Sequence, residues 1–152
     1  MKFLTILFMF FLSFFVQAQE NTSTLEQKDW LSDYNSALET AKSNKRNILL
    51  YFTGSDWCPP CKMLKKDFFE TSDFKVLSKS FVLLYIDIPR DRNSLTKEQL
   101  DHNMRLLPIY NKQGVFPVIK ILNSEGKVLD ELSGYRMNGN ILPYLTLMKK
   151  YK

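Results

Sequence analysis

The chain has 152 residues, of which 45% are hydrophobic and 24% are charged, and its 21 basic and 16 acidic side chains give a net charge of +5. This length allows a single domain with a core of its own. The basic residues are scattered along the chain, which argues against a nucleic-acid-binding surface, and no internal repeat is present.

The first eighteen residues have the pattern of a secretory signal peptide. Lys2 precedes an apolar run from Phe3 to Val16, and Val16-Gln17-Ala18 fits a cleavage site made of small residues. The run is shorter than the ~20 apolar residues that a membrane-spanning helix needs, so we expect export, with no stable membrane anchor after cleavage. The expected divisions are a signal peptide at 1–18, a flexible leader at 19–27 and one domain at 28–152, in a periplasmic or secreted protein.

Two elements are predicted before the cysteines of the chain. Apolar residues at helical spacing, from Trp30 and Tyr34 to Ala41, predict an amphipathic helix between Asp29 and about Lys45. The run from Asn47 to Thr53 is almost entirely apolar and predicts a buried strand.

The only two cysteines form the tetrapeptide Cys58-Pro59-Pro60-Cys61, at the start of a helix predicted from Pro59 to Glu70. A zinc site would need two further ligands, and the chain offers no third cysteine and a single histidine, His102. A structural disulfide is allowed in an exported protein, but a bridge across so short a loop removes little unfolded-state entropy. A redox-active dithiol is therefore the favoured interpretation, with zinc and a structural bridge as the alternatives.

The position of the cysteine pair favours thiolate chemistry. A cysteine at a helix N-terminus meets unsatisfied N–H groups and the positive end of the helix dipole. We expect Cys58 to attack a target disulfide and Cys61 to resolve the mixed disulfide. Because Pro59 and Pro60 have no N–H to donate to the Cys58 sulfur, Cys58 should be only moderately acidic.

Two charged residues flank the pair, and both are candidates for tuning the thiolate. The ammonium group of Lys62 favours the charged form of Cys58, whereas the carboxylate of Asp56 opposes it. The sequence leaves open which of the two groups lies nearer.

The residues after the helix predicted from Pro59 to Glu70 continue the alternation of strands and helices. Phe81 to Asp87 is apolar nearly throughout, as is typical of a strand that is covered on both faces. The order strand, helix, strand implies a right-handed parallel crossover.

The next segment, 88–114, is long and polar. Within it, Thr96-Lys97-Glu98-Gln99 fits a capping box, and the apolar residues that follow, among them Met104 and Leu107, predict a helix. Such an insertion either selects partners or covers the fold passively. We interpret His102 as a surface histidine.

The end of the chain predicts a hairpin and a helix. The strand Pro117 to Leu122 is followed by a tight turn at 123–126 and by the strand Val128 to Leu132. A last helix is predicted from about Gly139 to Tyr151.

The sequence Trp57-Cys58-Pro59-Pro60-Cys61-Lys62 after a hydrophobic strand resembles the active site of the thioredoxin superfamily. It is most similar to exported thioredoxin-like proteins of bacteria, and the resemblance covers roughly residues 28–151. It implies an α/β thioredoxin fold, with a central mixed β-sheet flanked by helices and an inserted helical segment before a cis-proline.

The resemblance also implies roles for residues outside the cysteine pair. Pro117 matches the position of the cis-proline, and Phe116 would then offer main-chain hydrogen bonds to an extended substrate. Trp57 matches a tryptophan that shields the dithiol and touches the target, and Gly134 matches a glycine after the last strand. A trans proline at a strand start, a packing role for Trp57 and a plain turn at Gly134 are the alternatives.

Two positions depart from the family pattern. Ordinary thioredoxins carry a buried aspartate in the strand before the motif, and Phe52 stands at that position here, while Leu83 matches the lysine that pairs with it. Proton transfer for Cys61 would then need water or another group, such as Asp56 or Glu70.

The function implied is an exported thiol–disulfide oxidoreductase that acts on protein cysteines through its dithiol, as a reductant or isomerase. Its partners would be substrate proteins with cysteines or disulfides and a membrane thiol-transfer protein that recharges it. No metal and no organic cofactor is expected besides the redox-active disulfide Cys58–Cys61. The alternatives are a disulfide-donating oxidase and a redox-inert module that binds extended peptides.

Overall fold

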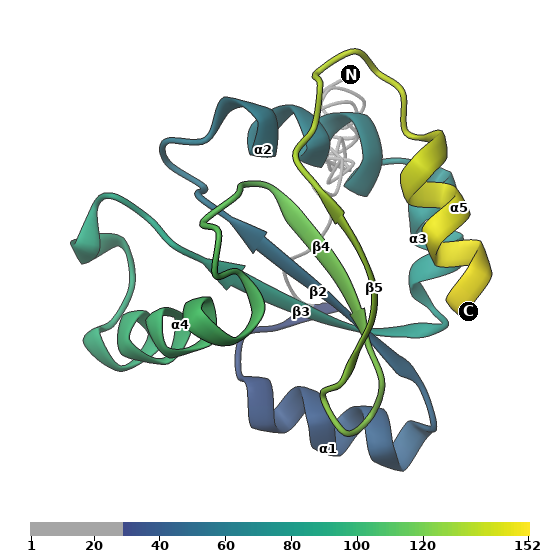
Figure 1. Cartoon of the computed structure of the whole chain (residues 1–152), viewed down its shortest axis with the longest axis horizontal. Coiled ribbons are helices and arrows are strands. Elements are labelled where there is room, and N and C mark those ends of the chain that lie inside the picture. Colours follow the sequence, from purple (N-terminus) through teal and green to yellow (C-terminus); the bar gives the residue numbers. More distant parts are fainter. Residues whose placement is uncertain (1–28) are drawn as a thin grey trace, which may run out of the picture.

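A five-stranded mixed sheet organises the fold in the computed structural model, which describes residues 29–152 (Figure 1). The spatial order is β1-β3-β2-β4-β5. The first three strands in this order are parallel, and β4 and β5 form an antiparallel hairpin that pairs with β2. The strands are β1 (Trp30–Leu31), β2 (Asn47–Thr53), β3 (Phe81–Asp87), β4 (Val118–Leu122) and β5 (Val128–Ser133).

Helices cover both faces of this sheet, as Figure 1 shows. Two helices pack on one face and three on the other. They are α1 (Tyr34–Asn44) and α4 (Lys97–Tyr110) on the first face, and α2 (Pro59–Leu64), α3 (Ser72–Ser78) and α5 (Leu142–Tyr151) on the second. The predicted α/β thioredoxin fold is confirmed, including the helix inserted between β3 and β4.

The alternation of side chains along the strands divides the core into two layers. In β2, Leu49 and Tyr51 face α2, α3 and α5, whereas Leu50 and Phe52 face α1 and α4. All four side chains are buried. The layer that contains Tyr51 is the one beneath the cysteine helix.

The predicted start of the first helix is wrong. Trp30 and Leu31 form the short strand β1, parallel to β3, and the Trp30 ring packs against Phe69 and Phe74. The helix begins only after Asp33, whose carboxylate accepts the Ser36 N–H at 2.7 Å. A capping side chain therefore sets the helix start that the apolar spacing placed too early.

The predicted helix from Pro59 to Glu70 is divided in the structure. Regular α2 ends at Leu64 and continues as a π-helical turn, Lys65–Phe69. A separate helix that the sequence analysis missed, α3, then begins after Thr71, whose hydroxyl accepts the Phe74 N–H. The break places Phe68 and Phe69 side by side in the core.

Two further boundaries differ from the predictions. The last helix begins at Leu142 rather than Gly139. In α4, Met104 is 44% exposed and does not mark the buried face, which is formed by Asn103, Leu106 and Tyr110. Within residues 29–152, no helix combines the length and hydropathy needed to cross a membrane.

Candidate functional site

The two cysteines form a disulfide at the N-terminus of α2, with their Cα atoms 5.3 Å apart. Cys58 is the N-cap of the helix, and its sulfur accepts the main-chain N–H of Cys61 at 3.2 Å. Both residues are only 2% exposed. The described residues hold no cluster of three or more histidine, cysteine or acidic side chains that suits a metal ion.

The two prolines occupy the first and second positions of α2. An N-cap side chain usually accepts from the amides of the second and third residues, and Pro60 removes the first of these. The Cys61 N–H that remains is shared, because it also lies 3.1 Å from the Cys58 carbonyl oxygen. The expected shortage of donors to the Cys58 sulfur is therefore present in the geometry.

Trp57 packs beside the cysteine pair and links it to two loops. Its indole N–H donates to the Ile88 carbonyl at 2.8 Å, and its ring meets the Phe116 ring edge to face, with centroids 5.3 Å apart. The Arg90 guanidinium lies over the same ring, 4.8 Å from the centroid. A Cβ on Gly54 would fall 2.3 Å from the indole, so this packing requires glycine there.

The Phe116–Pro117 peptide bond is cis, as the resemblance implied. The Pro117 carbonyl accepts the Gly134 N–H at 2.7 Å, so the glycine after β5 lies beside the proline. Through the contact between Phe116 and Trp57, this turn adjoins the cysteine loop. The roles of Trp57, Phe116 and Pro117 in holding a substrate remain predictions.

Asp56 and Lys62 hold loops in place. The Asp56 carboxylate accepts the main-chain N–H groups of Asp91 at 2.8 Å and Arg90 at 3.0 Å. The hydrogen bond from Asp91, and to a smaller extent the one from Arg90, holds the pKa of Asp56 below its usual range. The Lys62 ammonium donates to the Asp56 carbonyl at 2.9 Å. The tuning of Cys58 by either residue remains a prediction.

Phe52 lies on the face of β2 that points away from the cysteine helix. Phe52, which matches the family's aspartate by position, packs in the layer against α1 and α4. Tyr51 and Thr53 face the cysteine helix instead. The Tyr51 hydroxyl donates to Thr53 Oγ1 at 3.2 Å and approaches the Cys61 carbonyl oxygen at 3.4 Å. The β2 side chains on the side of Cys61 are therefore Tyr51 and Thr53, not Phe52.

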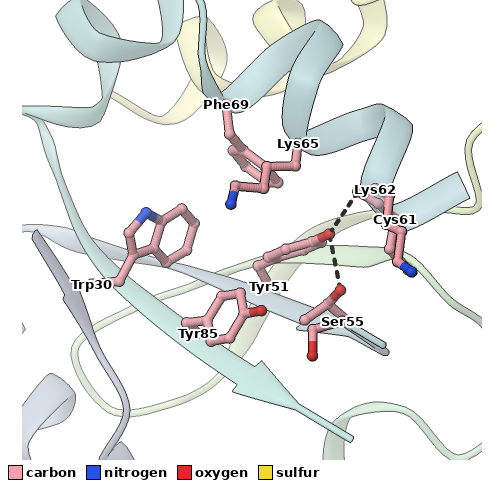
Figure 2. Close-up of a pocket in the computed structure, with 9 residues that line it drawn as sticks. Trp30, Tyr51, Ser55, Cys61, Lys62, Lys65, Phe69 and Tyr85 are labelled. Atoms are coloured by element: carbon pink, nitrogen blue, oxygen red, sulfur yellow. Dashed lines mark hydrogen bonds between the residues drawn. The ribbon is translucent and has the colours of Figure 1, made fainter. Parts of the chain in front are cut away.

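A cavity of about 220 Å³ lies between this face of the sheet and the cysteine helix (Figure 2). Aromatic rings, hydroxyl groups and two lysines surround it. Its lining residues are Trp30, Tyr51, Thr53, Ser55, Cys61, Lys62, Lys65, Phe69 and Tyr85. Burial raises the pKa of both Tyr51 and Tyr85 well above that of an ordinary tyrosine, so both hydroxyls stay neutral.

Next to the cavity lies a buried carboxylate that the sequence analysis did not single out. Asp87 ends β3 and is 6% exposed. Its two oxygens accept the Ser55 main-chain N–H at 2.9 Å and the Ser55 hydroxyl at 2.5 Å. A usable signal existed, because an acidic residue interrupts an otherwise apolar run at the end of this strand.

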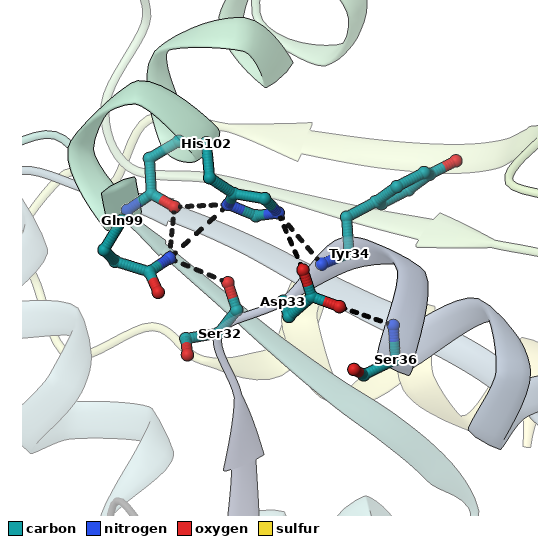
Figure 3. A network of polar contacts seen from close by, with 7 residues as sticks. Ser32, Asp33, Tyr34, Ser36, Gln99 and His102 are labelled. Carbon is teal, nitrogen blue, oxygen red and sulfur yellow. Dashed lines mark hydrogen bonds and ion pairs between the residues drawn. The ribbon is translucent and has the colours of Figure 1, made fainter. Parts of the chain in front are cut away.

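The insertion is attached to the rest of the fold through His102, so the expected surface histidine is wrong. The His102 Nε2 accepts the Tyr34 N–H at 3.0 Å, and only 17% of the side chain is exposed. Figure 3 shows this ring between Gln99 and the start of α1. The first N–H groups of a helix lack partners within it, and the imidazole supplies one of them.

Comparisons with known proteins agree with this architecture. A family model described as thioredoxin-like matches residues 29–124. The disulfide bond reductase DsbH of Chlamydia pneumoniae is 33% identical over 107 residues, covering 70% of this chain and 63% of that protein. The thiol:disulfide interchange protein DsbD of Vibrio cholerae serotype O1 is 30% identical over 118 residues, covering 76% of this chain and 18% of that protein.

A solved structure titled DsbH oxidoreductase has a TM-score of 0.67 and 27% identity, covering 87% of this chain and 92% of that chain. This chain spans less than two thirds of the length of the two curated relatives above.

Proposed function

The chain belongs to the thioredoxin-like family, and from this premise we propose that it is a thiol–disulfide oxidoreductase that reduces or isomerises disulfides of other proteins outside the cytoplasm. The observation that carries the proposal is the Cys58–Cys61 disulfide at the start of α2, beside Trp57 and the cis Phe116–Pro117 bond. The names of the two curated relatives, a disulfide bond reductase and a thiol:disulfide interchange protein, support the same chemistry.

The reduction follows from the positions of the two sulfurs. The Cys58 thiolate attacks a target disulfide, forms a mixed disulfide and releases one target sulfur as a thiolate. The Cys61 thiolate then attacks the Cys58 sulfur, breaks the mixed disulfide and releases the second target sulfur. The target gains two electrons and two protons, and the chain is left with the Cys58–Cys61 bond.

Substrate docking is expected beside Phe116. Among the residues that the structure describes, the Phe116 main chain has no hydrogen-bond partner, so it is open to an extended peptide that adds to the fold as a strand would. The half-buried Trp57 ring packs against Phe116 and offers the apolar wall of this surface. An extended segment with a disulfide is therefore the substrate that this surface fits.

A reductant in an oxidising compartment needs a source of electrons. The predicted signal peptide lies outside the described residues, and its pattern supports export. We therefore include a membrane thiol-transfer protein as the partner that reduces the Cys58–Cys61 bond again. The match to a thiol:disulfide interchange protein supports a partner of that kind.

Cysteine substitutions test the proposal on the mature chain. Wild type should catalyse reduction of insulin disulfides by dithiothreitol, and Cys58→Ser should abolish this activity because the attacking sulfur is gone. Cys61→Ala should accumulate mixed disulfides with target proteins, because they no longer resolve. If wild type shows no catalysis and Cys61→Ala traps no protein, the chain is a redox-inert binding module instead.

The reduction potential of the disulfide distinguishes a reductant from an oxidase. We expect a value near that of thioredoxin, about −270 mV, on equilibration with glutathione. A value near −120 mV, as in the strongest periplasmic oxidants, would reverse the direction and favour disulfide donation.

A further inference from the structure

Resolution of a mixed disulfide requires Cys61 to lose a proton. A thiol has an ordinary pKa of about 8.5, and only the thiolate attacks a disulfide sulfur. Cys61 is 2% exposed, so bulk water does not reach it freely. The cavity of Figure 2, which Cys61 lines, is the space through which its proton can leave.

The two acceptors suggested by the sequence are not placed for this task. The Asp56 carboxylate faces the amides of Arg90 and Asp91. Glu70 is exposed and is not among the residues that line the cavity. Neither carboxylate therefore serves the space beside Cys61.

The titratable side chains that line the cavity are also unsuited to hold the proton. Lys62 and Lys65, from the cysteine helix and the turn that follows it, carry ammonium groups, which donate hydrogen bonds and accept none. Tyr51 from β2 and Tyr85 from β3 remain neutral, because burial raises the pKa of each phenol. Their hydroxyls can pass a proton along a hydrogen-bond chain without becoming its final acceptor.

Asp87 supplies the missing carboxylate through Ser55. It lies on the same face of β3 as Tyr85, because side chains two residues apart share a face. One carboxylate oxygen accepts the Ser55 hydroxyl at 2.5 Å, and Ser55 lines the cavity together with Cys61. The Asn103 amide donates to the Asp87 carbonyl at 2.8 Å and so holds this residue in place.

Two further hydroxyl groups line the same cavity, those of Thr53 and Tyr51. Thr53 Oγ1 and the Tyr51 hydroxyl are 3.2 Å apart, and the latter approaches the Cys61 carbonyl at 3.4 Å. A cavity of this size, with these hydroxyl groups in its lining, has room for water between them.

We propose that Asp87 is the proton acceptor for Cys61, reached through the Ser55 hydroxyl and water in the cavity. The step rests on the proposed oxidoreductase function. The Cys61 proton moves to the Asp87 carboxylate as the Cys61 sulfur bonds to the Cys58 sulfur, and the mixed disulfide breaks. The released target thiolate takes up a proton, which Asp87 returns through the same hydroxyls or solvent supplies.

The test follows the two thiols of the reduced chain separately with dithiobis(nitrobenzoate) in a stopped-flow instrument. Cys58 releases one nitrothiobenzoate in a phase whose rate depends on reagent concentration. Attack by Cys61 releases the second in a phase that is independent of concentration, and Cys61→Ala should lack this phase.

Asp87→Asn keeps the shape of the side chain and can still accept the Ser55 N–H, but its amide NH2 donates to the Ser55 hydroxyl instead of accepting from it, and the side chain no longer takes up a proton. We expect it to slow the second phase by about tenfold or more near pH 7, as for loss of a general base. The difference from wild type should shrink toward pH 9, because hydroxide that enters the cavity can then take the thiol proton in place of Asp87. The first phase should be unchanged within about twofold at every pH.

Two further variants separate proton transfer from structure. Ser55→Ala removes the hydroxyl of an exposed residue and should reproduce the loss even if Asp87→Asn does not fold. Asp67→Asn alters a carboxylate that binds the Tyr135 hydroxyl outside the cavity, and it should leave the second phase unchanged. Equal slowing at all pH values, or no slowing in Asp87→Asn and Ser55→Ala, would overturn the proposal.

Failure of the proposed function has a different signature. If wild type shows both phases but does not reduce insulin, the chain has a working dithiol and the oxidoreductase function is wrong. If insulin is reduced and the rate of the second phase is unchanged in Asp87→Asn and Ser55→Ala, only the proton route is wrong.

Discussion

Pro60 determines how many main-chain amides reach the Cys58 sulfur. It occupies the second position of α2, where an amide would ordinarily donate to the N-cap side chain. Pro59 stands at the first position, whose N–H seldom reaches the cap. The two prolines are therefore not equivalent, although the sequence presents them side by side.

This difference gives a prediction at the scale of one residue. Pro60→Ala should add a donor to the Cys58 thiolate, stabilise the reduced form and raise the reduction potential on the order of 30 mV, equivalent to ~1.4 kcal/mol. Pro59→Ala is the matched control and should change the potential much less. Equilibration with glutathione measures both, and a larger rise in Pro59→Ala would contradict the argument.

The surroundings of each side chain in β2 depend on which face of the strand it occupies. Phe52 and Tyr51 are neighbours in sequence, yet they lie in different core layers. A shift of one residue in a strand exchanges the two faces. Counting from the cysteine motif therefore identified a side chain on the face of β2 away from the cysteine helix.

At the scale of elements, α4 is attached to the sheet by polar contacts as well as apolar ones. Asn103 is 2% exposed and donates to the Asp87 carbonyl at the end of β3. Its neighbour His102 accepts the first N–H of α1. The inserted helix thus binds both β3 and α1 through two consecutive side chains.

Loss of the Asn103 amide should destabilise the chain. Asn103→Ala leaves a buried carbonyl without its donor, so we expect the free energy of unfolding to fall by about 1–3 kcal/mol. Urea denaturation of the oxidised protein measures this. Met104→Ala, at a position 44% exposed on the same helix, should change stability by no more than about 0.5 kcal/mol. Equal losses in the two variants would refute the anchoring role.

The whole molecule is stabilised by an aromatic cluster between α2, α3 and α5. Phe68 is fully buried and contacts the rings of Phe69, Phe74 and Tyr144. These residues come from the π-helical turn and from two different helices, so the cluster joins distant parts of the chain. The cysteine helix packs on the same cluster.

Truncation of this ring should be far more costly than truncation at the surface. Phe68→Ala should lower the free energy of unfolding by about 3–5 kcal/mol, through lost burial and a residual cavity. Val76→Ala, at a residue 67% exposed on α3, should cost no more than about 0.5 kcal/mol. Urea midpoints of the oxidised proteins compare them, and a Phe68→Ala loss below ~1 kcal/mol would contradict the cluster's importance.

The sequence by itself determined the features that depend on local pattern. The cysteine spacing, the two central strands, the hairpin and the Thr96 N-cap of the inserted helix all follow from residues close together in the chain. The second half of the predicted capping box does not form, because the Gln99 amide donates to the Ser32 carbonyl and to Asn103 instead. The short strand at Trp30 was missed because its partner Leu83 is distant in sequence. Helix α3 was missed because a π-helical turn interrupts the apolar spacing before it.

The surroundings of Cys61 were decided only by the tertiary structure. Tyr51 and Ser55 come from β2 and the loop after it, whereas Asp87 ends β3, and only the parallel pairing of β2 with β3 brings Asp87 against the Ser55 that lines the cavity. Strand pairing and the choice of face are long-range packing outcomes, so no local pattern encodes them. Four consecutive residues thus encode the dithiol, whereas the fold brings together the groups around it.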